Sequence, residues 1–429
     1  MQPRNCLRSS CSRPEWLGPC NSGRLLRSRC RKCPKQDGGK WPASNQNKLR
    51  NIRDSQGGGQ VMGMGLGDKL RITLFGESHG TCVGALVEGM PPGTPINPDS
   101  LSREINRRKP GRKGLSSRRE ADECQVLSGI YEGKATGWPI LMLTMNSDVR
   151  SSDYSFLPDH PRPGHADMVE MVRSEGSSDL RGGGSQSARL TFGMVAAGSQ
   201  ARTLLDQAGW SCIAHLHSVG EVTSRPLFQL DRGSEIESGS DMARLNCRDP
   251  EAVGKMSEFI ETVRMDKDSV GSVVELLIEG IPIGVGEPWF DGIEPSLARA
   301  MMAIPGARAV EFSHGVESSR MRGSDHNDPW LSGDGAPVLE GASSGEADGS
   351  LGGRSTGAPI RVKVHFKPPS SFPKEQLTLH LPSDEVMPLE VGGRHDPVLG
   401  PRAVPVVEAA AILVMADLGL MGGFLEGED

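Results

Sequence analysis

Three short segments of the sequence place a histidine close to glycine, a combination that suits acid–base chemistry. Residues 75–80 read FGESHG, residues 162–167 read RPGHAD and residues 393–397 read GRHDP. Histidine titrates near neutral pH and can transfer protons, and glycine lets the backbone approach a ligand closely. One such segment alone could equally be a hairpin turn with a half-exposed histidine. Because three occur in one chain, and two also carry arginine and aspartate, we predict that they converge on one site.

Two further segments are suited to binding anions. Residues 181–189 read RGGGSQSAR and precede a predicted helix that runs to about residue 208. Glycines before a helix start offer free backbone N–H groups at the positive end of the helix dipole, and the flanking arginines add forked donors. The pattern matches neither a dinucleotide-binding loop nor a Walker loop, and a flexible linker is the alternative. Residues 367–371 read KPPSS after a predicted strand and form a second candidate phosphate clasp.

A dense basic cluster also favours an acidic ligand. It holds seven cations within residues 107–119, after a predicted helix that is capped by Asn97 and ends before Pro110. On its own, such a run could equally be a solvated surface. Residues 1–67, however, hold 13 Lys and Arg against 3 Asp and Glu, so the remaining chain carries a net charge of −16 within an overall −6. Cations gathered in an acidic body repel one another unless an anion lies nearby.

The first 67 residues differ from the rest in composition and mark a domain boundary. Five of the nine cysteines fall there, among many serines and arginines, so we expect residues 1–67 to be a disordered basic leader. It is either an organelle transit peptide or sequence upstream of a true start at Met62 or Met64. The pair Cys30 and Cys33 lacks a second pair at zinc spacing, so we predict no metal site. We expect residues 68–429 to form one catalytic domain in a reducing, cytoplasmic compartment, or in a plastid if the leader is a transit peptide.

Strands and helices alternate along residues 68–429, which predicts an α/β fold. The last helix, near residues 404–421, is apolar on several faces and must be buried in the core or between subunits. We find no apolar run of the roughly 18 residues that cross a bilayer, and so expect a soluble protein that binds neither membrane nor nucleic acid. Residues 83–93 and 270–284 are alike in order and residue type, which suggests two related halves about a pseudo-dyad.

Together these segments make the chain resemble the chorismate synthases from about residue 68 to residue 420. The resemblance is carried by residues 76–80, 107–111, 118–120, 146–154, 162–167, 181–184, 286–288, 367–371 and 394–397. It implies a β-α-β sandwich of α+β class with internal pseudo-symmetry, assembled as a homotetramer. It also implies a carbon–oxygen lyase that removes phosphate and the C6 hydrogen from 5-enolpyruvylshikimate 3-phosphate by anti-1,4-elimination. The product is chorismate, and reduced FMN is required although there is no net redox change.

The resemblance also implies roles for individual residues. His165 would donate a proton to the departing phosphate, His79 would serve the N1 side of the flavin, and Asp396 would assist removal of a proton from flavin N5. The substrate anions would be bound by arginines and one serine: Arg108, Arg162, Arg189, Arg394 and Ser187, with Arg112 assisting. FMN would be bound by residues of several segments: Ser185, Gln186, Ser187, Pro305, Gly306, Gly352, Lys367, Pro368, Pro369, Ser370, Ser371 and Arg394.

The chain departs from the family pattern at several positions. Ser185 and Gln186 stand where a basic residue commonly follows the three glycines, and Gly114 stands where an arginine is common. Glu346 and Asp348 would be unfavourable near an anionic cofactor unless their side chains turn outward. Because the histidine segments are intact, we expect activity to survive these changes.

No added reductase region is visible, so we expect reduced FMN to come from a partner flavin reductase or from the cellular pool, with NADPH as the indirect reductant. Two other classes of protein stay open. One is an inactive homologue that binds FMN or phosphate. The other is a flavin oxidoreductase, which would need a nicotinamide site that the sequence does not show.

Overall fold

The computed structural model describes residues 63–111, 115, 122–147, 151–174, 178–343 and 345–425. The predicted leader up to Met62, together with Arg112 and Gly114, therefore lies outside the described residues. By their mutual contacts, residues 62–429 form one unit.

The first sheet is antiparallel and lies in the N-terminal half of the described residues. Its order is β1 (Gly65–Leu66), β2 (Arg71–Gly76), β3 (Cys82–Glu88), β7 (Ile140–Met145) and β4 (Gln125–Val126). Ile72 on β2 pairs with Val87 on β3, and both are buried. Ile140 and Met142 continue the buried row on β7, because alternate residues of a strand share a face. This face packs on the helices described below.

The second sheet is also antiparallel, and its order is β11 (Ala307–Phe312), β16 (Ile360–Phe366), β10 (Ser272–Glu279), β8 (Ser211–Val219) and β9 (Val222–Thr223). Its middle strand is β10, and the middle strand of the first sheet is β3. The two segments whose likeness suggested related halves therefore contain strands at equivalent places in the two sheets.

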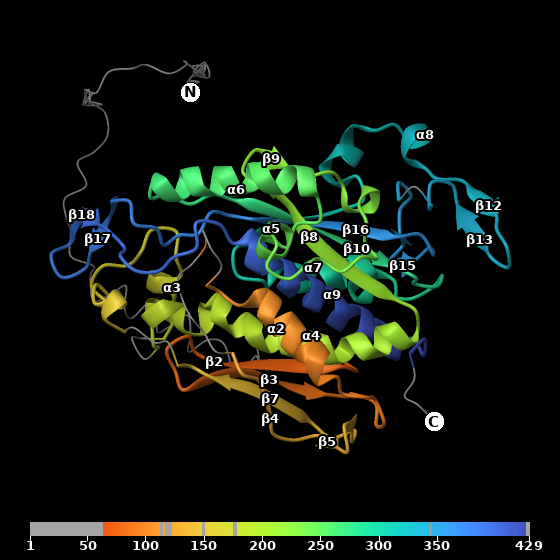
Figure 1. The fold of residues 1–429 in the computed structure, drawn as a ribbon, viewed down its shortest axis with the longest axis horizontal. Helices are drawn as coiled ribbons and strands as arrows, with labels where there is room; N and C mark the ends of the chain where they lie inside the picture. Colours follow the sequence, from red (N-terminus) through yellow and green to blue (C-terminus); the bar gives the residue numbers. More distant parts are fainter. Residues whose placement is uncertain are drawn as a thin grey trace, which may run out of the picture. The chain divides into compact units, whose positions relative to one another are not determined.

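Helices fill the layer between the sheets (Figure 1). They are α2 (Pro98–Arg108), α4 (Thr191–Gln207) and α9 (Gly400–Met421), and α7 (Ile293–Met302) packs on α9 and β11. Asn97 accepts a hydrogen bond from the backbone N–H of Ser100 at 2.9 Å and so caps α2, as predicted. A layer of helices between two sheets confirms the predicted β-α-β sandwich of α+β class.

Helix α9 corrects one expectation from the sequence. By length and composition it is apolar enough to cross a membrane, with a mean hydropathy of 1.9, so the statement that the chain holds no such run was wrong. In the structure, 89% of this apolar stretch is buried inside the protein. The helix packs along α4 and on β8, β10 and α7. This packing confirms the prediction that the final helix is buried.

The remaining elements lie in the connections. They are β5 (Ile130–Tyr131), β6 (Lys134–Ala135), α3 (Asp167–Arg173), α5 (Asp241–Leu245), α6 (Pro250–Met265), α8 (Gly323–His326), β12 (Trp330–Ser332), β13 (Pro337–Leu339), β14 (Ser350–Leu351), β15 (Arg354–Ser355), β17 (Gln376–His380) and β18 (Glu385–Leu389).

The close packing of α4 on α9 depends on Gly198. A Cβ atom built at Gly198 would lie 2.7 Å from the Cβ atom of Ala409, a contact that would push the helices apart. Gly198→Ala should therefore lower the free energy of unfolding by about 1–3 kcal/mol, the usual range for an overpacked core. Urea unfolding followed by circular dichroism measures the change.

The matched control is Gly254→Ala on α6, where nothing lies within 4 Å of the added atom. The gain in helix propensity should raise the free energy of unfolding there by about 0.5–1 kcal/mol. If both variants gained stability equally, the crossing of α4 and α9 would not be sterically limited.

Candidate active site

A cavity of about 480 Å³ opens where segments distant in sequence meet. Its walls come from η1 (Ser151–Tyr154), the loop before α3, the glycine-rich loop, the start of β11, the segment after β16 and the turn into α9. Most of the predicted site residues line this cavity: Arg162, His165, Gln186, Ser187, Arg189, Pro305, Gly306, Lys367, Pro369, Ser370, Ser371, Arg394 and Asp396. The second and third histidine segments therefore meet at one place.

The first histidine segment lies directly behind this wall. The ring of His79 packs edge-on against Tyr154 with 5.0 Å between the ring centroids, and Tyr154 lines the cavity. A Cβ atom built at Gly182 would lie 2.6 Å from Cε1 of His79. His79 thus contacts two lining residues without lining the cavity itself.

The glycine-rich loop, η2 (Arg181–Gln186), has a backbone that glycine makes possible. The φ angles of Gly182, Gly183 and Gly184 are 62°, 94° and 53°, in the region that side chains rarely adopt. A Cβ atom built at Gly183 would lie 3.3 Å from Cε1 of His165. The loop therefore supports both histidines, one at Gly182 and the other at Gly183.

A buried carboxylate orients His165. Asp167 accepts hydrogen bonds from Nε and Nη2 of Arg162 at 2.7 and 2.6 Å, and its Oδ1 lies 2.7 Å from Nδ1 of His165. Burial alone would raise the pKa of Asp167, but the hydrogen bonds from Arg162 and His165 hold that pKa well below its usual range. Nδ1 of His165 is also 3.1 Å from Nη2 of Arg162, but the carboxylate contact is shorter. We therefore assign the Nδ1 proton to the bond with Asp167, which leaves Nε2 for chemistry.

A second buried carboxylate, Asp122, joins two arginines. It pairs with Arg108 at 3.2 Å and, at shorter range, with Arg189. Arg108 is only 1% exposed and donates from Nε to Thr191 and from Nη2 to the carbonyl of Ala188. Arg189 lines the cavity whereas Arg108 does not, so Arg108 supports the wall from behind.

The segment after β16 is fastened to the second histidine segment. Nζ of Lys367 donates to the carbonyl of Gly164 at 2.5 Å and to Oγ of Ser370 at 2.8 Å. Arg162 donates from Nη1 to Oγ of Ser371 at 3.0 Å. Burial, with the nearby charge of Arg308, lowers the pKa of Lys367. These bonds hold Lys367, Ser370 and Ser371 at the edge of the cavity.

Asp396 is held by an arginine that the sequence analysis did not single out. Nη1 of Arg402 donates to Oδ2 of Asp396 at 2.6 Å, and its Nε donates to the carbonyl of Arg108 at 3.3 Å. Arg402 lies in the first turn of α9, so the helix start fixes the direction of the Asp396 carboxylate. Asp396 and Arg402 both line the cavity.

Three residues predicted to bind the cofactor do not line the cavity. Ser185 is exposed beside Gln186, Pro368 lies between the lining residues Lys367 and Pro369, and Gly352 lies in the turn between β14 and β15. Their roles stay predictions. Glu346 and Asp348, which would repel an anionic cofactor, do not line the cavity either.

The sequence analysis missed four residues that shape the site. Asp167 belongs to the second histidine segment and follows His165 by two positions, a spacing that could have identified it. Asp122, Arg308 and Arg402 carry no local signal, since their partners are set by folding. With them, the lining of the described cavity is strongly basic and includes Arg162, Arg189, Arg308, Lys367, Arg394 and Arg402 around the carboxylate of Asp396. Such a lining suits a small molecule with several negative charges.

The fold and the cavity thus define a β-α-β sandwich protein with a basic site for a polyanionic small molecule. The family described as chorismate synthase matches residues 70–420, and the chain belongs to that family. Members of this family are lyases of the shikimate pathway.

Similar proteins agree with this assignment. A chorismate synthase of Methanosarcina mazei is 44% identical over 361 residues, which cover 84% of this chain and 96% of that protein. One from Aeropyrum pernix is 44% identical over 356 residues, which cover 83% of this chain and 92% of that protein. A solved crystal structure of chorismate synthase matches with a TM-score of 0.62 and 25% identity, covering 83% of this chain and 93% of the other.

The contact between Gly182 and His79 generates a test. Gly182→Ala places a methyl group 2.6 Å from His79 and 2.5 Å from Oγ of Ser78, so the loop or the ring must move. We expect lyase activity to fall roughly 100-fold, because small displacements in an active site have effects of this size. The control is Gly133→Ala, since Gly133 has a similar φ of 77° but nothing lies within 4 Å of its added atom. Unchanged activity in folded Gly182→Ala would show that the position of His79 does not matter.

Proposed function

We propose that the protein converts 5-enolpyruvylshikimate 3-phosphate to chorismate by anti-1,4-elimination of phosphate and the C6 hydrogen, with reduced FMN as cofactor. The observation that carries this proposal is the convergence of His165, Asp396 and six cationic side chains on one cavity, in a chain of this family. A substrate with a phosphate and two carboxylates needs several guanidinium groups around it.

The chain's arginines bind and orient the substrate. Arg162, Arg189 and Arg394 line the cavity and, with Ser187, bind the phosphate and carboxylate groups. Arg108 acts by holding Arg189 in place through Asp122. The predicted assistance from Arg112 lies outside the described residues.

The donors around the cavity fit FMN. Lys367, Ser370 and Ser371 contribute an ammonium and two hydroxyl groups to the lining, which also includes Gln186 and Ser187 after the glycines. When bound, reduced FMN supplies the electron density that relieves positive charge as phosphate departs, and a nitrogen that takes the C6 proton. The walls of the cavity orient the two molecules and exclude water.

Two side chains move protons. Nε2 of His165 donates a proton to the departing phosphate, while Asp167 fixes the other ring nitrogen and stabilises the protonated ring. The Asp396 carboxylate, directed by Arg402, would assist removal of the proton from flavin N5. His79 lies behind Tyr154 and would serve the N1 side of the flavin.

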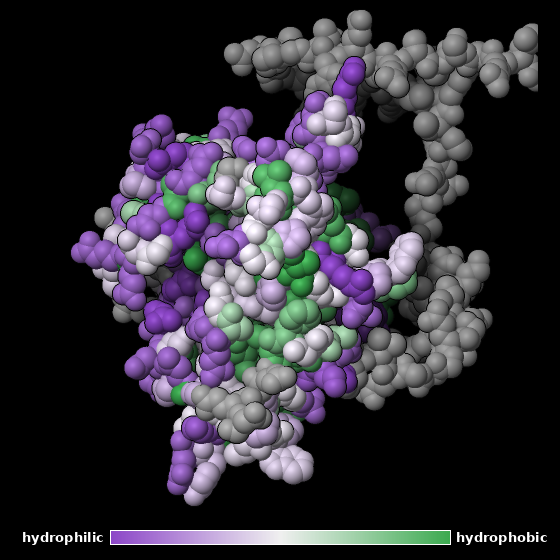
Figure 2. All heavy atoms as spheres, turned by 90° about the vertical axis from the view of Figure 1, so that its right-hand side faces the viewer, coloured by the Kyte–Doolittle hydropathy of each residue, from purple (hydrophilic) through white to green (hydrophobic). Residues whose placement is uncertain are grey.

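We further propose a homotetramer in the cytoplasm, supplied with reduced FMN by a separate reductase that uses NADPH. Large apolar side chains gather on the face shown in Figure 2. Phe290 is 88% exposed, and Met421 and Phe424 are exposed at the C-terminal end of α9. An apolar face of this kind supports burial against a second subunit.

Phosphate release from 5-enolpyruvylshikimate 3-phosphate with dithionite-reduced FMN, under anaerobic conditions, tests the reaction. FMN binding without phosphate release by folded protein would leave the inactive homologue as the better description. NADPH oxidation that depends on FMN, without release of phosphate, would favour a flavin oxidoreductase.

Replacing His165 tests the proton donor. His165→Ala should reduce turnover roughly 100-fold or more, the usual contribution of a positioned acid. The control is His314→Ala, because His314 does not line the cavity. Turnover near that of the wild type in folded His165→Ala would remove His165 from the mechanism.

Replacing Asp167 tests its charge separately from its shape. The lowered pKa of Asp167 keeps its carboxylate ionised across the neutral range, where it accepts hydrogen bonds from Arg162 and lies against Nδ1 of His165. Asp167→Asn keeps the size of the side chain but removes its charge and replaces one accepting oxygen by a donor, so turnover should fall roughly 10-fold or more across this range.

Turnover measured from pH 5.5 to 9 checks this, with Asp266→Asn at the end of α6 as the control. Turnover equal to that of the wild type across this range, in folded Asp167→Asn, would mean that the charge of Asp167 is not needed.

A further inference from the structure

The second sheet carries a cluster of metal-binding side chains that the proposed reaction does not use. His215 and His217 lie on β8, and Glu275 lies opposite His215 on β10. Their neighbours Ala214 and Leu216 face the helical core, so the two imidazoles lie on the other face of the sheet. All three side chains are buried, and none lines the cavity described above.

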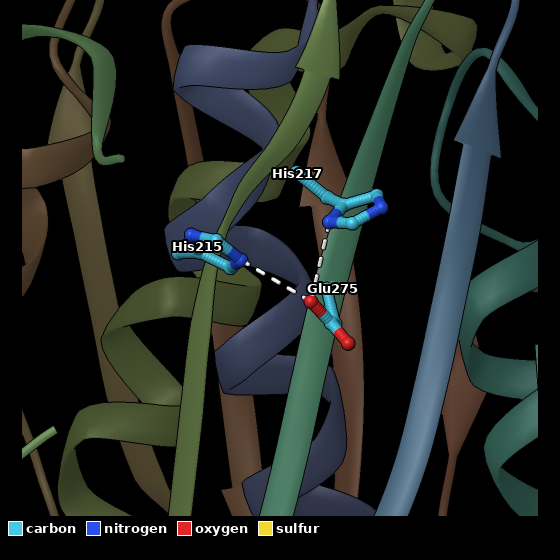
Figure 3. A group of neighbouring side chains, drawn as sticks. All are labelled: His215, His217 and Glu275. Carbon is cyan, nitrogen blue, oxygen red and sulfur yellow. Dashed lines mark hydrogen bonds and ion pairs between the residues drawn. The ribbon is translucent and has the colours of Figure 1, made fainter. Parts of the chain in front are cut away.

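The three side chains converge (Figure 3). Nε2 of His215 and Nδ1 of His217 each lie 3.3 Å from Oε2 of Glu275, and the three ligand atoms all lie within 4.8 Å of one another. Tetrahedral zinc with bonds of about 2.0–2.1 Å places its ligand atoms about 3.3–3.4 Å apart. Two of the three edges of this triangle therefore already have the length that such an ion requires.

Local structure aims the ligands at one another. The pairing of β10 with β8 shifts register between Val273 and Val274, so His217 is the extra residue of a bulge. Bulges redirect a side chain, and this one turns His217 toward Glu275. The backbone N–H of Leu227 donates to Oε2 of Glu275 at 2.8 Å and fixes the carboxylate. In protein metal sites, the residues that bind the metal are typically held by hydrogen bonds from groups that do not contact the metal.

We propose that His215, His217 and Glu275 form a structural site for a divalent transition-metal ion of the zinc type. Two imidazoles and one carboxylate suit zinc, whereas magnesium and calcium prefer oxygen ligands throughout. The ion joins the neighbouring strands β8 and β10 and takes no part in the elimination.

The test is a zinc titration of the full chain after removal of metals with a chelator. We expect wild-type protein to bind zinc with micromolar or tighter affinity, and both Glu275→Gln and His217→Gln to lose one ion per chain or to weaken its binding roughly 100-fold. The matched control is His365→Gln, because His365 lies on β16 of the same sheet but outside the cluster. Circular dichroism of the metal-free variants confirms folding.

Cobalt(II) provides a second readout that needs no variant. Cobalt bound by the cluster shows visible d–d bands without the near-ultraviolet thiolate band that cysteine ligands, including Cys30 and Cys33, would add. No tight zinc binding by the wild type, or binding that persists in both cluster variants, would overturn the proposal and leave the three side chains as a hydrogen-bonded group. Neither result depends on lyase activity.

Discussion

Gathering cations around one cavity raises their mutual repulsion, and buried carboxylates offset it. Asp167 lies against Arg162 and His165, and Asp122 joins Arg108 to Arg189. Each of these carboxylates is almost inaccessible to water, so its charge is weakly screened and acts strongly on the arginine beside it. The positive groups can therefore face a ligand in the cavity, while the buried carboxylates on their far side neutralise part of their charge.

The middle layer of helices positions these charged groups around the cavity. α4 begins shortly after the glycine-rich loop, and α9 begins directly after the third histidine segment, so both helices start at the cavity. Their N-terminal ends add the positive end of a helix dipole to the basic side chains. Because Gly198 lets α4 approach Ala409 on α9 closely, the spacing of these two starts is set by packing deep in the core.

Two of the departures from the family pattern have hydrogen-bond partners other than the groups that move protons. Gln186 lines the cavity and donates to Glu170 at 3.2 Å. Asp348 is engaged elsewhere, where its backbone N–H donates to Asp328 at 3.1 Å. Substitutions at such positions change the rim or the neighbouring loops, and leave the central carboxylate and histidine contacts in place.

Sequence patterns determined the elements and most of the lining. The strand periods, the Asn97 cap and the glycine, arginine and histidine segments are local features, because each depends on residues a few positions apart. The family resemblance also predicted that Arg162, Arg189 and Arg394 belong to one site.

Only the tertiary structure decided which groups pair. Arg402 meets the backbone of Arg108 across 294 positions, and Lys367 meets Gly164 across 203. The tertiary structure also decided the place of α9. Its composition suits a membrane as well as a protein core, and in the fold the surrounding sheets and helices bury it. Composition specifies what a side chain can do, whereas its partner depends on the direction in which the folded backbone points it.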